Sequence, residues 1–180
     1  MLLLSQLCPN YIYAIHYSYY EAFIWCKNSS LVSLLYFLQN HTNTQYTSLY
    51  ELAVIDYPGT RYRFQLIYQL LSVHYNSRIY IVCYAHEFEA LPTVTHVYAS
   101  ASWLEREAWD LFGVSFRQHP DLRRILTDYG FKGHPLRKDF PLSGYVEVFY
   151  DDQQKKITYV PVSLAQEYRI FKFNNPWSRY

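Results

Sequence analysis

The sequence has 180 residues and a mass of 21.7 kDa, which is enough for one domain with its own hydrophobic core and too little for two. With 51% hydrophobic and 17% charged residues, the composition excludes a disordered chain. The net charge of +1 provides no broad field that would recruit nucleic acid or an anionic membrane. The five glycines form no dinucleotide-binding or phosphate-binding loop, and the three cysteines are too dispersed for an iron–sulfur cluster or a disulfide framework. We therefore expect a chain from a reducing compartment.

The N-terminal residues do not resemble a targeting or membrane-spanning segment. Residues 1–4 are apolar but no basic residue precedes them, which fits a secretory signal poorly. Lys27 is the single basic residue among the first thirty, which disfavours an Arg-rich transit peptide. The longest apolar run, residues 34–38, is much shorter than the roughly 20 residues that span a bilayer.

One helix and three strands are predicted next along the chain. Leucines at helical spacing, preceded by serines that can cap, predict a helix over residues 30–39, whereas residues 11–27 support no assignment. Three apolar runs separated by short turns favour an antiparallel meander, and they cover residues 49–56, 63–73 and 78–85. Residues 79–84 lack polar alternation, which predicts a central strand covered on both faces.

A second helix is marked at both of its ends. Ser102 and Glu105 have the spacing of a capping box, and Gly113 stands where a left-handed C-terminal cap would be. Arg106 and Asp110 are four residues apart, so that they can pair on the helix surface.

Beyond Gly113 the chain is irregular and proline-rich through Pro141, and residues 145–150 and 156–160 then predict a hairpin. Residues 174–177 are expected to be irregular. We predict an α+β fold: a mixed or antiparallel sheet with helices packed on it, followed by a long irregular C-terminal strap and the hairpin. The predicted parts of this one domain are an N-terminal helical and aromatic segment (1–48), an α+β core (49–117) and an extended interface segment (118–180).

Charged residues concentrate on the second helix and just after it: Glu105, Arg106, Glu107, Asp110, His119, Asp121, Arg123 and Arg124. Two carboxylates and a histidine could form an acid–base site, because such catalysis needs titratable groups held near a reacting proton. Alternatively, these residues form an ion-pair network that ties the following loop to the helix. We favour the network, since such networks perturb titration without being catalytic.

A second charged cluster spans residues 134–141. Arg137 and Lys138 could bind an anion. Alternatively, two prolines stiffen an extended segment whose charges meet a neighbouring subunit, which is the interpretation we favour. No metal motif is evident, because His86 and Glu87 are not followed by the second histidine of a His-Glu-x-x-His pattern.

The residues from the second helix onward resemble one protein family. The matching pattern covers residues 105–107, 110–113, 119–131, 133–148, 166–169 and 176–177, with weaker likeness at 56–58 and 76–79. It is similar to the 30-kDa-type subunit of respiratory complex I, NADH:ubiquinone oxidoreductase, known as subunit 9 where organelles encode it. Residues 1–48 show no family pattern, and Phe149 stands where a basic residue is expected.

The resemblance implies a non-catalytic subunit of the peripheral arm, which scaffolds the quinone-reducing module against the 49-kDa-type subunit. It implies a position on the matrix side of the mitochondrial inner membrane. It also implies that this chain binds no cofactor, because NADH, FMN, the Fe–S clusters and ubiquinone are held by partner subunits. The 21 tyrosines and 11 phenylalanines suggest an AT-rich genome, and hence a gene on mitochondrial DNA.

We expect roles for two groups of residues. A network between helix and strap is expected from Glu105, Arg106, Glu107, Asp110, His119, Arg123 and Arg124. Contacts with partner subunits are expected from His134, Arg137, Lys138, Asp139, Pro141 and Trp177. Two alternatives remain open: the equivalent subunit of a plastid NAD(P)H dehydrogenase or a membrane-bound hydrogenase, and a free-standing hydrolase that uses Glu107 and His119.

Overall fold

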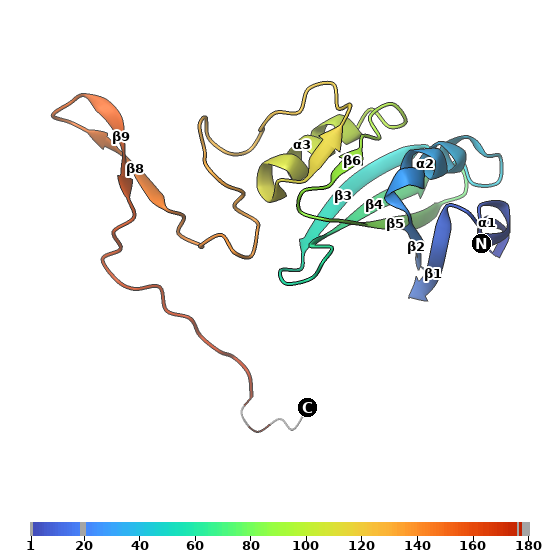
Figure 1. Cartoon of the computed structure of the whole chain (residues 1–180), viewed down its shortest axis with the longest axis horizontal. Helices are drawn as coiled ribbons and strands as arrows, with labels where there is room; N and C mark the ends of the chain where they lie inside the picture. The colour runs from blue at the N-terminus through green and yellow to red at the C-terminus, as the bar shows by residue number, and fades with distance from the viewer. Residues whose placement is uncertain (1, 19–20, 176, 178–180) are drawn as a thin grey trace. The chain divides into compact units, whose positions relative to one another are not determined.

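The computed structural model describes residues 2–18, 21–175 and 177 (Figure 1). The chain divides into two compact units, Met1–Phe140 and Pro141–Tyr180, which we call the N-terminal unit and the C-terminal unit. The predicted boundaries after residues 48 and 117 stay predictions.

The N-terminal unit is built on a five-stranded sheet with the strand order β1-β2-β5-β4-β3. The strands are β1 (Ile12–Ser18), β2 (Glu21–Cys26), β3 (Ser48–Asp56), β4 (Phe64–Ser72) and β5 (Ser77–Ala85). The predicted antiparallel meander β3-β4-β5 is confirmed, while β2 pairs with β5 in parallel. The sheet is therefore mixed, and the predicted α+β class is confirmed.

Strand β5 lies at the centre of this sheet, as predicted. Ile79, Ile81 and Cys83 are fully buried on one face. On the other face Val82 is buried, but Tyr80 and Tyr84 keep part of their surface exposed. The second face is therefore only partly covered. The large tyrosine rings supply part of that cover themselves.

The helices pack against the sheet, and the three α-helices contribute buried residues to a single hydrophobic cluster (Figure 1). They are α1 (Leu2–Leu7), the 3-10 turn η1 (Asn28–Ser30), α2 (Leu31–Asn40) and α3 (Ala101–Phe112). In α2, the leucines at helical spacing are fully buried, as the pattern predicts: Leu31, Leu34, Leu35 and Leu38. Ser30 occupies the N-cap position, but its hydroxyl donates to the carbonyl of Lys27 and accepts no hydrogen bond from a helix N–H group.

Helix α3 differs from the prediction at its start and agrees with it at its end. Its N-cap residue is Ser100, and no side chain caps the helix, so the capping box predicted from Ser102 and Glu105 is wrong. Glu105 is buried and is bonded elsewhere. At the C-terminus, Gly113 has a φ of 77° and forms the predicted left-handed cap, with its N–H donating to the carbonyl of Trp109.

The chain after α3 is largely irregular, as predicted. A short strand, β7 (Ser115–Arg117), pairs in parallel with β6 (Ala90–Pro92), a contact that the sequence pattern did not reveal. In the described part of the chain, none of the helices combines the length and the apolar character needed to cross a bilayer.

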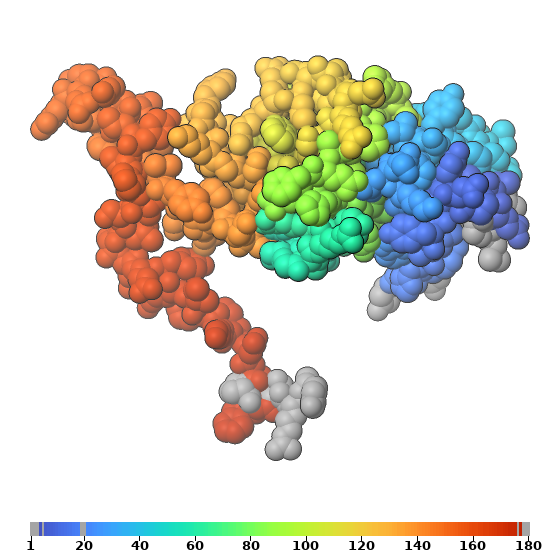
Figure 2. All heavy atoms as spheres, viewed as in Figure 1, coloured from blue at the N-terminus to red at the C-terminus, as the bar shows by residue number. Residues whose placement is uncertain are grey.

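The C-terminal unit contains the predicted hairpin, formed by β8 (Val146–Asp151) and β9 (Lys156–Pro161). Residues 171–175 have no regular structure, and of the expected irregular tail Pro176 lies outside the described residues. Figure 2 shows residues 141–175, in orange and red, as a narrow chain without a rounded core of its own.

Replacing Gly113 with alanine should lower the free energy of unfolding by about 2–4 kcal/mol. An alanine strains the positive φ, and its Cβ would lie 2.5 Å from Nη2 of Arg137 and 2.6 Å from Nε2 of His134. Gly130→Ala is the control, since φ there is 72° but nothing lies within 4 Å of the added Cβ. Urea unfolding of the two variants measures the difference, and equal losses would contradict the role of the close packing.

Candidate functional site

The side chain of Asp110, in α3, is fully buried and organises the segment that follows the helix. Its Oδ2 accepts hydrogen bonds from the backbone N–H groups of Ile125 at 3.1 Å, Leu126 at 2.7 Å and Thr127 at 2.9 Å. Its Oδ1 accepts from the hydroxyl of Thr127 at 2.6 Å and from the guanidinium of Arg124 at 2.9 Å. One carboxylate thereby supplies the partners that these backbone groups lack without regular secondary structure.

Arginine side chains complete the attachment of this segment. Arg124 also donates to the carbonyl of Gly133 at 2.9 Å. Arg106, which is buried in α3, donates through Nε to the carbonyl of Arg123 at 3.1 Å. The predicted pairing of Arg106 with Asp110 is therefore wrong, because each binds the loop rather than its neighbour on the helix.

The hydrogen bonds determine the charge of Asp110. Burial alone would raise the pKa of this carboxyl group, because it disfavours the charged form. The hydrogen bonds from Thr127, Leu126 and Arg124 outweigh this effect and hold the pKa well below its ordinary value. Asp110 is thus ionised in the folded chain at physiological pH.

A second buried carboxyl group, that of Glu105, lies on the same helix. Its Oε2 accepts from the hydroxyl of Thr93 at 2.5 Å, and its Oε1 accepts from the N–H of Val94 at 2.7 Å. Burial raises the pKa of Glu105 to about 7, although these two hydrogen bonds act in the opposite direction. Glu105 and Asp110 are equally buried, but only Asp110 has an arginine bonded to its carboxylate.

His119 lies next to Glu105, with its Nε2 at 3.8 Å from Oε2 of the carboxyl group. Its Nδ1 accepts a hydrogen bond from the N–H of Asp121 at 3.1 Å. In the neutral ring the proton is then on Nε2, from where it is donated to the carbonyl of Ser102 at 3.2 Å. The imidazole therefore holds the loop to the start of α3.

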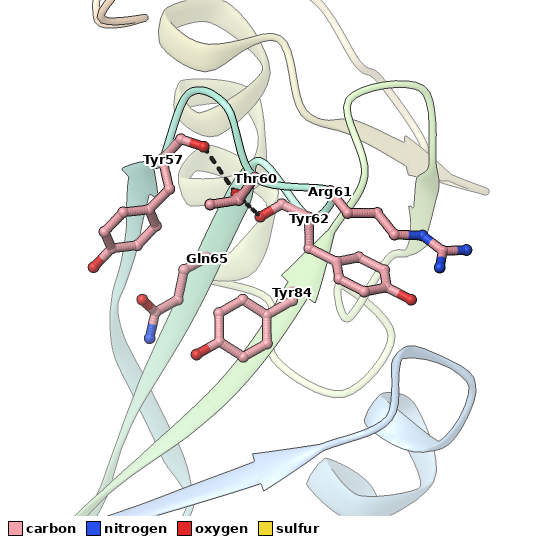
Figure 3. A pocket seen from close by; sticks show the side chains of 6 residues that line it. All are labelled: Tyr57, Thr60, Arg61, Tyr62, Gln65 and Tyr84. Carbon is pink, nitrogen blue, oxygen red and sulfur yellow. Dashed lines mark hydrogen bonds between the residues drawn. The ribbon is translucent and has the colours of Figure 1, made fainter.

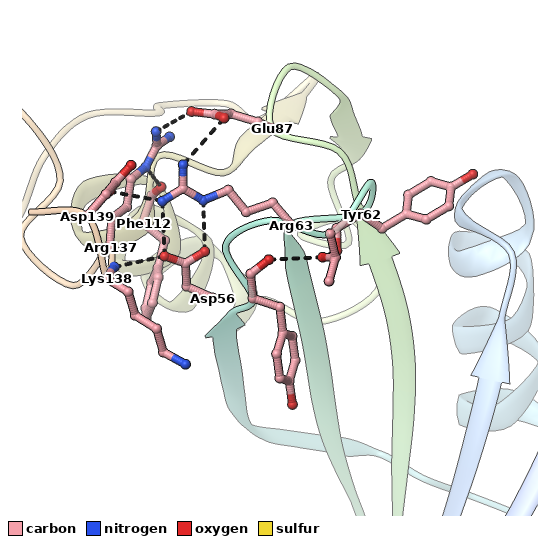
Figure 4. Close-up of polar contacts among 10 residues, drawn as sticks. Asp56, Tyr62, Arg63, Glu87, Phe112, Arg137, Lys138 and Asp139 are labelled. Atoms are coloured by element: carbon pink, nitrogen blue, oxygen red, sulfur yellow. Dashed lines mark hydrogen bonds and ion pairs between the residues drawn. The ribbon is translucent and has the colours of Figure 1, made fainter.

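A second network joins β3 and β4 to the end of the proline-rich segment, which we define as residues 118–140 (Figure 4). Arg63 binds both carboxylate oxygens of Asp56, through Nε at 2.8 Å and Nη2 at 3.1 Å. The same guanidinium contacts Asp139 at 2.9 Å and Glu87 at 3.4 Å. Glu87 in turn binds Arg137 at 2.6 Å. Every ion pair of this network therefore joins a basic to an acidic side chain, and Arg63 links three carboxylates.

Backbone groups extend this second network. The N–H of Lys138 donates to Oδ2 of Asp56 at 2.8 Å, and Nε of Arg137 donates to the carbonyl of Phe112 at 2.6 Å. Burial would raise the pKa of Asp56, but the hydrogen bonds from Arg63 and Lys138 lower it further than burial raises it. The C-terminal end of α3, the β3–β4 turn and the proline-rich segment are therefore held at one place.

The structure brings together most of the charged residues that the sequence singled out on and after α3. Glu105, Arg106, Asp110, His119 and Arg124 make the contacts described above. Glu107 is exposed on α3, whereas the side chain of His119 is buried beside Glu105, so Glu107 and His119 do not form the hypothesised catalytic pair. The side chain of Arg123 is 70% exposed and binds only Asp121, itself exposed, among the described residues.

The residues expected to meet partners fall into two groups. His134, Arg137 and Asp139 contact their own chain, and Nδ1 of His134 lies 3.0 Å from the carbonyl of Asp110. The other three present exposed side chains, Lys138, Pro141 and Trp177, and of these the ammonium of Lys138 also lies 5.6 Å from the centre of the Tyr57 ring.

Three members of the second network were not predicted from the sequence: Asp56, Arg63 and Glu87. Asp56 and Arg63 carry opposite charges on either side of the β3–β4 turn, and this pattern is the signal that could have revealed their pairing. Glu87 lies far from both in the sequence and had no such signal.

The surface of the N-terminal unit also has shallow hollows. One of about 370 Å³ is lined by Tyr57, Thr60, Arg61, Tyr62, Gln65 and Tyr84 (Figure 3). A second shares Tyr62 and Tyr84 with it and reaches Tyr13 and Lys27. Within residues 2–18, 21–175 and 177, no three His, Cys, Asp or Glu side chains are grouped to hold a metal ion.

The fold and its two networks define a class of protein: an α+β module that fixes a long irregular segment to its own surface by buried ion pairs. The family model described as "Respiratory-chain NADH dehydrogenase, 30 Kd subunit" matches residues 24–146. The chain belongs to this family and is a subunit of NADH:ubiquinone oxidoreductase, respiratory complex I.

Curated relatives carry matching names. The chain is 50% identical to NADH-ubiquinone oxidoreductase subunit 9 of Reclinomonas americana over 98% of this chain and 86% of that protein. It is 56% identical to subunit 9 of Prototheca wickerhamii over 83% of this chain and 78% of that protein. It is 54% identical to NADH dehydrogenase [ubiquinone] iron-sulfur protein 3 of Arabidopsis thaliana, again over 83% and 78%.

A solved structure shows the same fold. It is a chain of the membrane-bound sulfane sulfur reductase, an archaeal respiratory membrane complex, with a TM-score of 0.66 and 20% sequence identity. The match covers 78% of this chain and 85% of that chain.

Replacing Asp110 with asparagine should lower the free energy of unfolding at pH 7 by about 2–4 kcal/mol, because an amide cannot replace the charge that binds Arg124 and the backbone donors. The lowered pKa of Asp110 means that its contribution is present above the ordinary value of 3.8 and is lost as the pH falls below it. Urea unfolding at pH 7 and pH 3 should show a smaller difference between the two proteins at pH 3, which does not vanish because the carboxylate of the folded chain is still ionised there. Glu107→Gln is the exposed control on the same helix and should change little.

Replacing Glu105 with glutamine should change the pH dependence of stability in the direction opposite to Asp110→Asn: relative to wild type, the variant becomes more stable as the pH rises. Because the folded-state pKa of about 7 exceeds the ordinary 4.5, the wild-type chain loses stability as the pH rises between these values. Relative to wild type, Glu105→Gln should therefore gain up to about 3 kcal/mol between pH 5 and pH 8. Parallel unfolding curves for both proteins across this range would contradict the raised pKa.

Proposed function

We propose that this chain is a non-catalytic scaffold of the peripheral arm, which holds the quinone-reducing module against the 49-kDa-type subunit. The observation that carries the proposal is the exposure of large apolar side chains in the C-terminal unit: Ile170 is 80% exposed, Phe173 91% and Trp177 86%. Large apolar side chains that are exposed close together in the sequence support a protein–protein contact site, because contiguous apolar surface in water marks such sites. The two ion-pair networks serve the same role, because they position the segment from which this unit starts.

We also propose that NADH, FMN, the Fe–S clusters and ubiquinone are bound by partner subunits. The polar groups around α3 that could serve catalysis are bonded to this chain's own backbone and ion-pair partners. The cysteines are poor ligand candidates, because burial raises the pKa of Cys26 to about 12 and that of Cys83 well above its ordinary value. A thiol that stays protonated is a weak nucleophile and metal ligand.

The proposed location is the matrix side of the mitochondrial inner membrane, reached through the complex, with the gene on mitochondrial DNA. The relatives' names support a ubiquinone-reducing complex rather than a plastid dehydrogenase or a hydrogenase. A native gel of solubilised membranes tests this proposal: the chain should migrate with a large complex that oxidises NADH. A stable monomer with hydrolase activity would contradict it.

Substitutions of two adjacent arginines, Arg123 and Arg124, test the scaffold role within the complex. Arg124→Ala removes the bonds to Asp110 and Gly133, and it should lower the amount of assembled complex by about tenfold while NADH:ubiquinone turnover per assembled complex stays unchanged. Arg123→Ala is the control, because its side chain is exposed and should leave assembly intact. Normal assembly of Arg124→Ala with lost turnover would instead indicate a catalytic role.

A further inference from the structure

The carboxyl group of Glu105 is fully buried and is bonded to groups that carry no charge. Its Oε2 is bonded to the hydroxyl of Thr93 at 2.5 Å, and its Oε1 accepts from the N–H of Val94 at 2.7 Å. Among the described residues, the one basic side chain within 4 Å of it is that of His119, whose Nε2 lies 3.8 Å from Oε2. Ionising a buried carboxyl group that has no bonded cation is costly, so this site favours the neutral form far more than water does.

The hydroxyl groups beside this carboxyl group suit both of its charge states. Oγ1 of Thr93 lies 3.0 Å from Oγ1 of Thr95, and either atom can be the donor. When Glu105 is neutral, its O–H can donate to Thr93, which then donates to Thr95. When Glu105 is ionised, both hydroxyls reverse, so that Thr95 donates to Thr93 and Thr93 donates to the carboxylate. The site can therefore bind and release a proton without losing its hydrogen bonds.

On the side of the sheet, the hydroxyl of Tyr68 in β4 interacts electrostatically with Glu105. It is fully buried and has no hydrogen-bond partner among the described residues. Burial first, and then the charges of Cys83, Glu105 and Cys26, raise the pKa of Tyr68 well above its ordinary value. Burial also raises the pKa of Cys83 well above its ordinary value. These groups stay neutral at physiological pH and do not compensate a charge on Glu105.

Two charged residues of α3 near Glu105 bind other parts of the chain. Arg106 donates to the carbonyl of Arg123, and the carboxylate of Asp110 is paired with Arg124. Loss of the proton from Glu105 therefore leaves a buried negative charge that the side chains of its own helix do not neutralise.

The imidazole of His119, which lies against Glu105, belongs to a weakly held part of the chain. The imidazole is fully buried and is held by the carbonyl of Ser102 and the N–H of Asp121. The preceding residue, Gln118, has a φ of 62°, a left-handed conformation that is unfavourable for a residue with a side chain. Residues 118–121 form neither helix nor strand, so they can open while β7 stays paired with β6.

We propose that Glu105 is a proton-binding site that controls the attachment of residues 118–121: the neutral carboxyl group keeps the imidazole of His119 packed against α3, and loss of the proton releases it. The opened segment lets water reach the carboxylate, which an uncompensated charge requires. The ligand of this site is the proton itself. The attachment at Asp110 takes no part, because that carboxylate keeps its own partners when residues 118–121 open. The inference is independent of the scaffold function proposed above.

The direction of the effect follows from the pKa of Glu105, which is about 7 in the folded chain against the ordinary 4.5. A state in which water reaches the carboxyl group regains the ordinary pKa. Its population therefore rises as the pH increases from 4.5 to about 7 and is constant above that range. Each pH unit within the range changes the population by up to about tenfold.

Hydrogen exchange of the Val94 N–H, measured by NMR on the full-length chain and corrected for the intrinsic rate at each pH, tests the proposal. Its protection should fall by about tenfold or more between pH 5 and pH 7.5, because this N–H is bonded to Glu105. In Glu105→Gln, which is neutral at every pH, protection should stay within about twofold. The N–H of Leu126, which is bonded to Asp110, is the internal control and should keep its protection in both proteins.

Two further measurements identify the residues that move and the group that holds the proton. The rate at which diethylpyrocarbonate modifies His119, relative to the exposed His96, should rise about tenfold from pH 5 to pH 7.5 in wild type compared with Glu105→Gln. Thr93→Val removes the hydroxyl that donates to the carboxylate, so it should move the fall in Val94 protection to higher pH by about one pH unit.

Four outcomes would overturn the inference. Protection of Val94 that has the same pH dependence in Glu105→Gln would show that another group binds the proton, and protection equal to that of the β4 N–H groups would show that only global unfolding exposes the site. Unchanged modification of His119 would place the opening elsewhere in the chain. Protection that rises with pH would show that Glu105 and His119 form an ion pair, which closes the segment instead of opening it.

Discussion

The ionised, buried carboxylate of Asp110 is the interaction on which the rest of this arrangement depends. The proline-rich segment makes few regular backbone hydrogen bonds, and unpaired N–H groups next to a hydrophobic core are costly. Asp110 satisfies three of them in sequence and binds Arg124, which continues the contact to Gly133. A single helix position thereby determines where the whole segment lies on the N-terminal unit.

The second network repeats this physical solution at the other end of the segment. Asp56 binds both a guanidinium and the N–H of Lys138, just as Asp110 binds Arg124 and backbone donors. Burying a charge is unfavourable unless it is paired and hydrogen-bonded, so each network tolerates burial only when complete. The segment is consequently attached at two points, and the chain leaves the N-terminal unit at a defined position before the hairpin.

The sequence predicted well those elements whose signal is local. The buried leucines of α2, the strands β3 to β5, the left-handed cap at Gly113 and the hairpin all follow from periodicity and turn residues. Strand β1 was missed because its aromatic, apolar and polar residues follow no clear period. Strand β2 was missed although residues 22–26 are all apolar, because this run is short and its partner in parallel pairing is the distant β5. The capping box failed for a similar reason, since Glu105 finds Thr93 and Val94 instead.

The sequence by itself determined the α+β class, the resemblance to the complex I subunit and the concentration of charge on and after α3. It could not determine which charges meet, because ion pairs form between residues that only tertiary packing brings within about 3 Å. Hence Arg106 and Asp110, neighbours on one helix turn, bind the loop and not each other, while Arg63 and Asp139 are joined across most of the N-terminal unit's sequence. Which side chains of the hairpin share a face was likewise decided by strand register, since a shift of one residue would move every side chain to the other side.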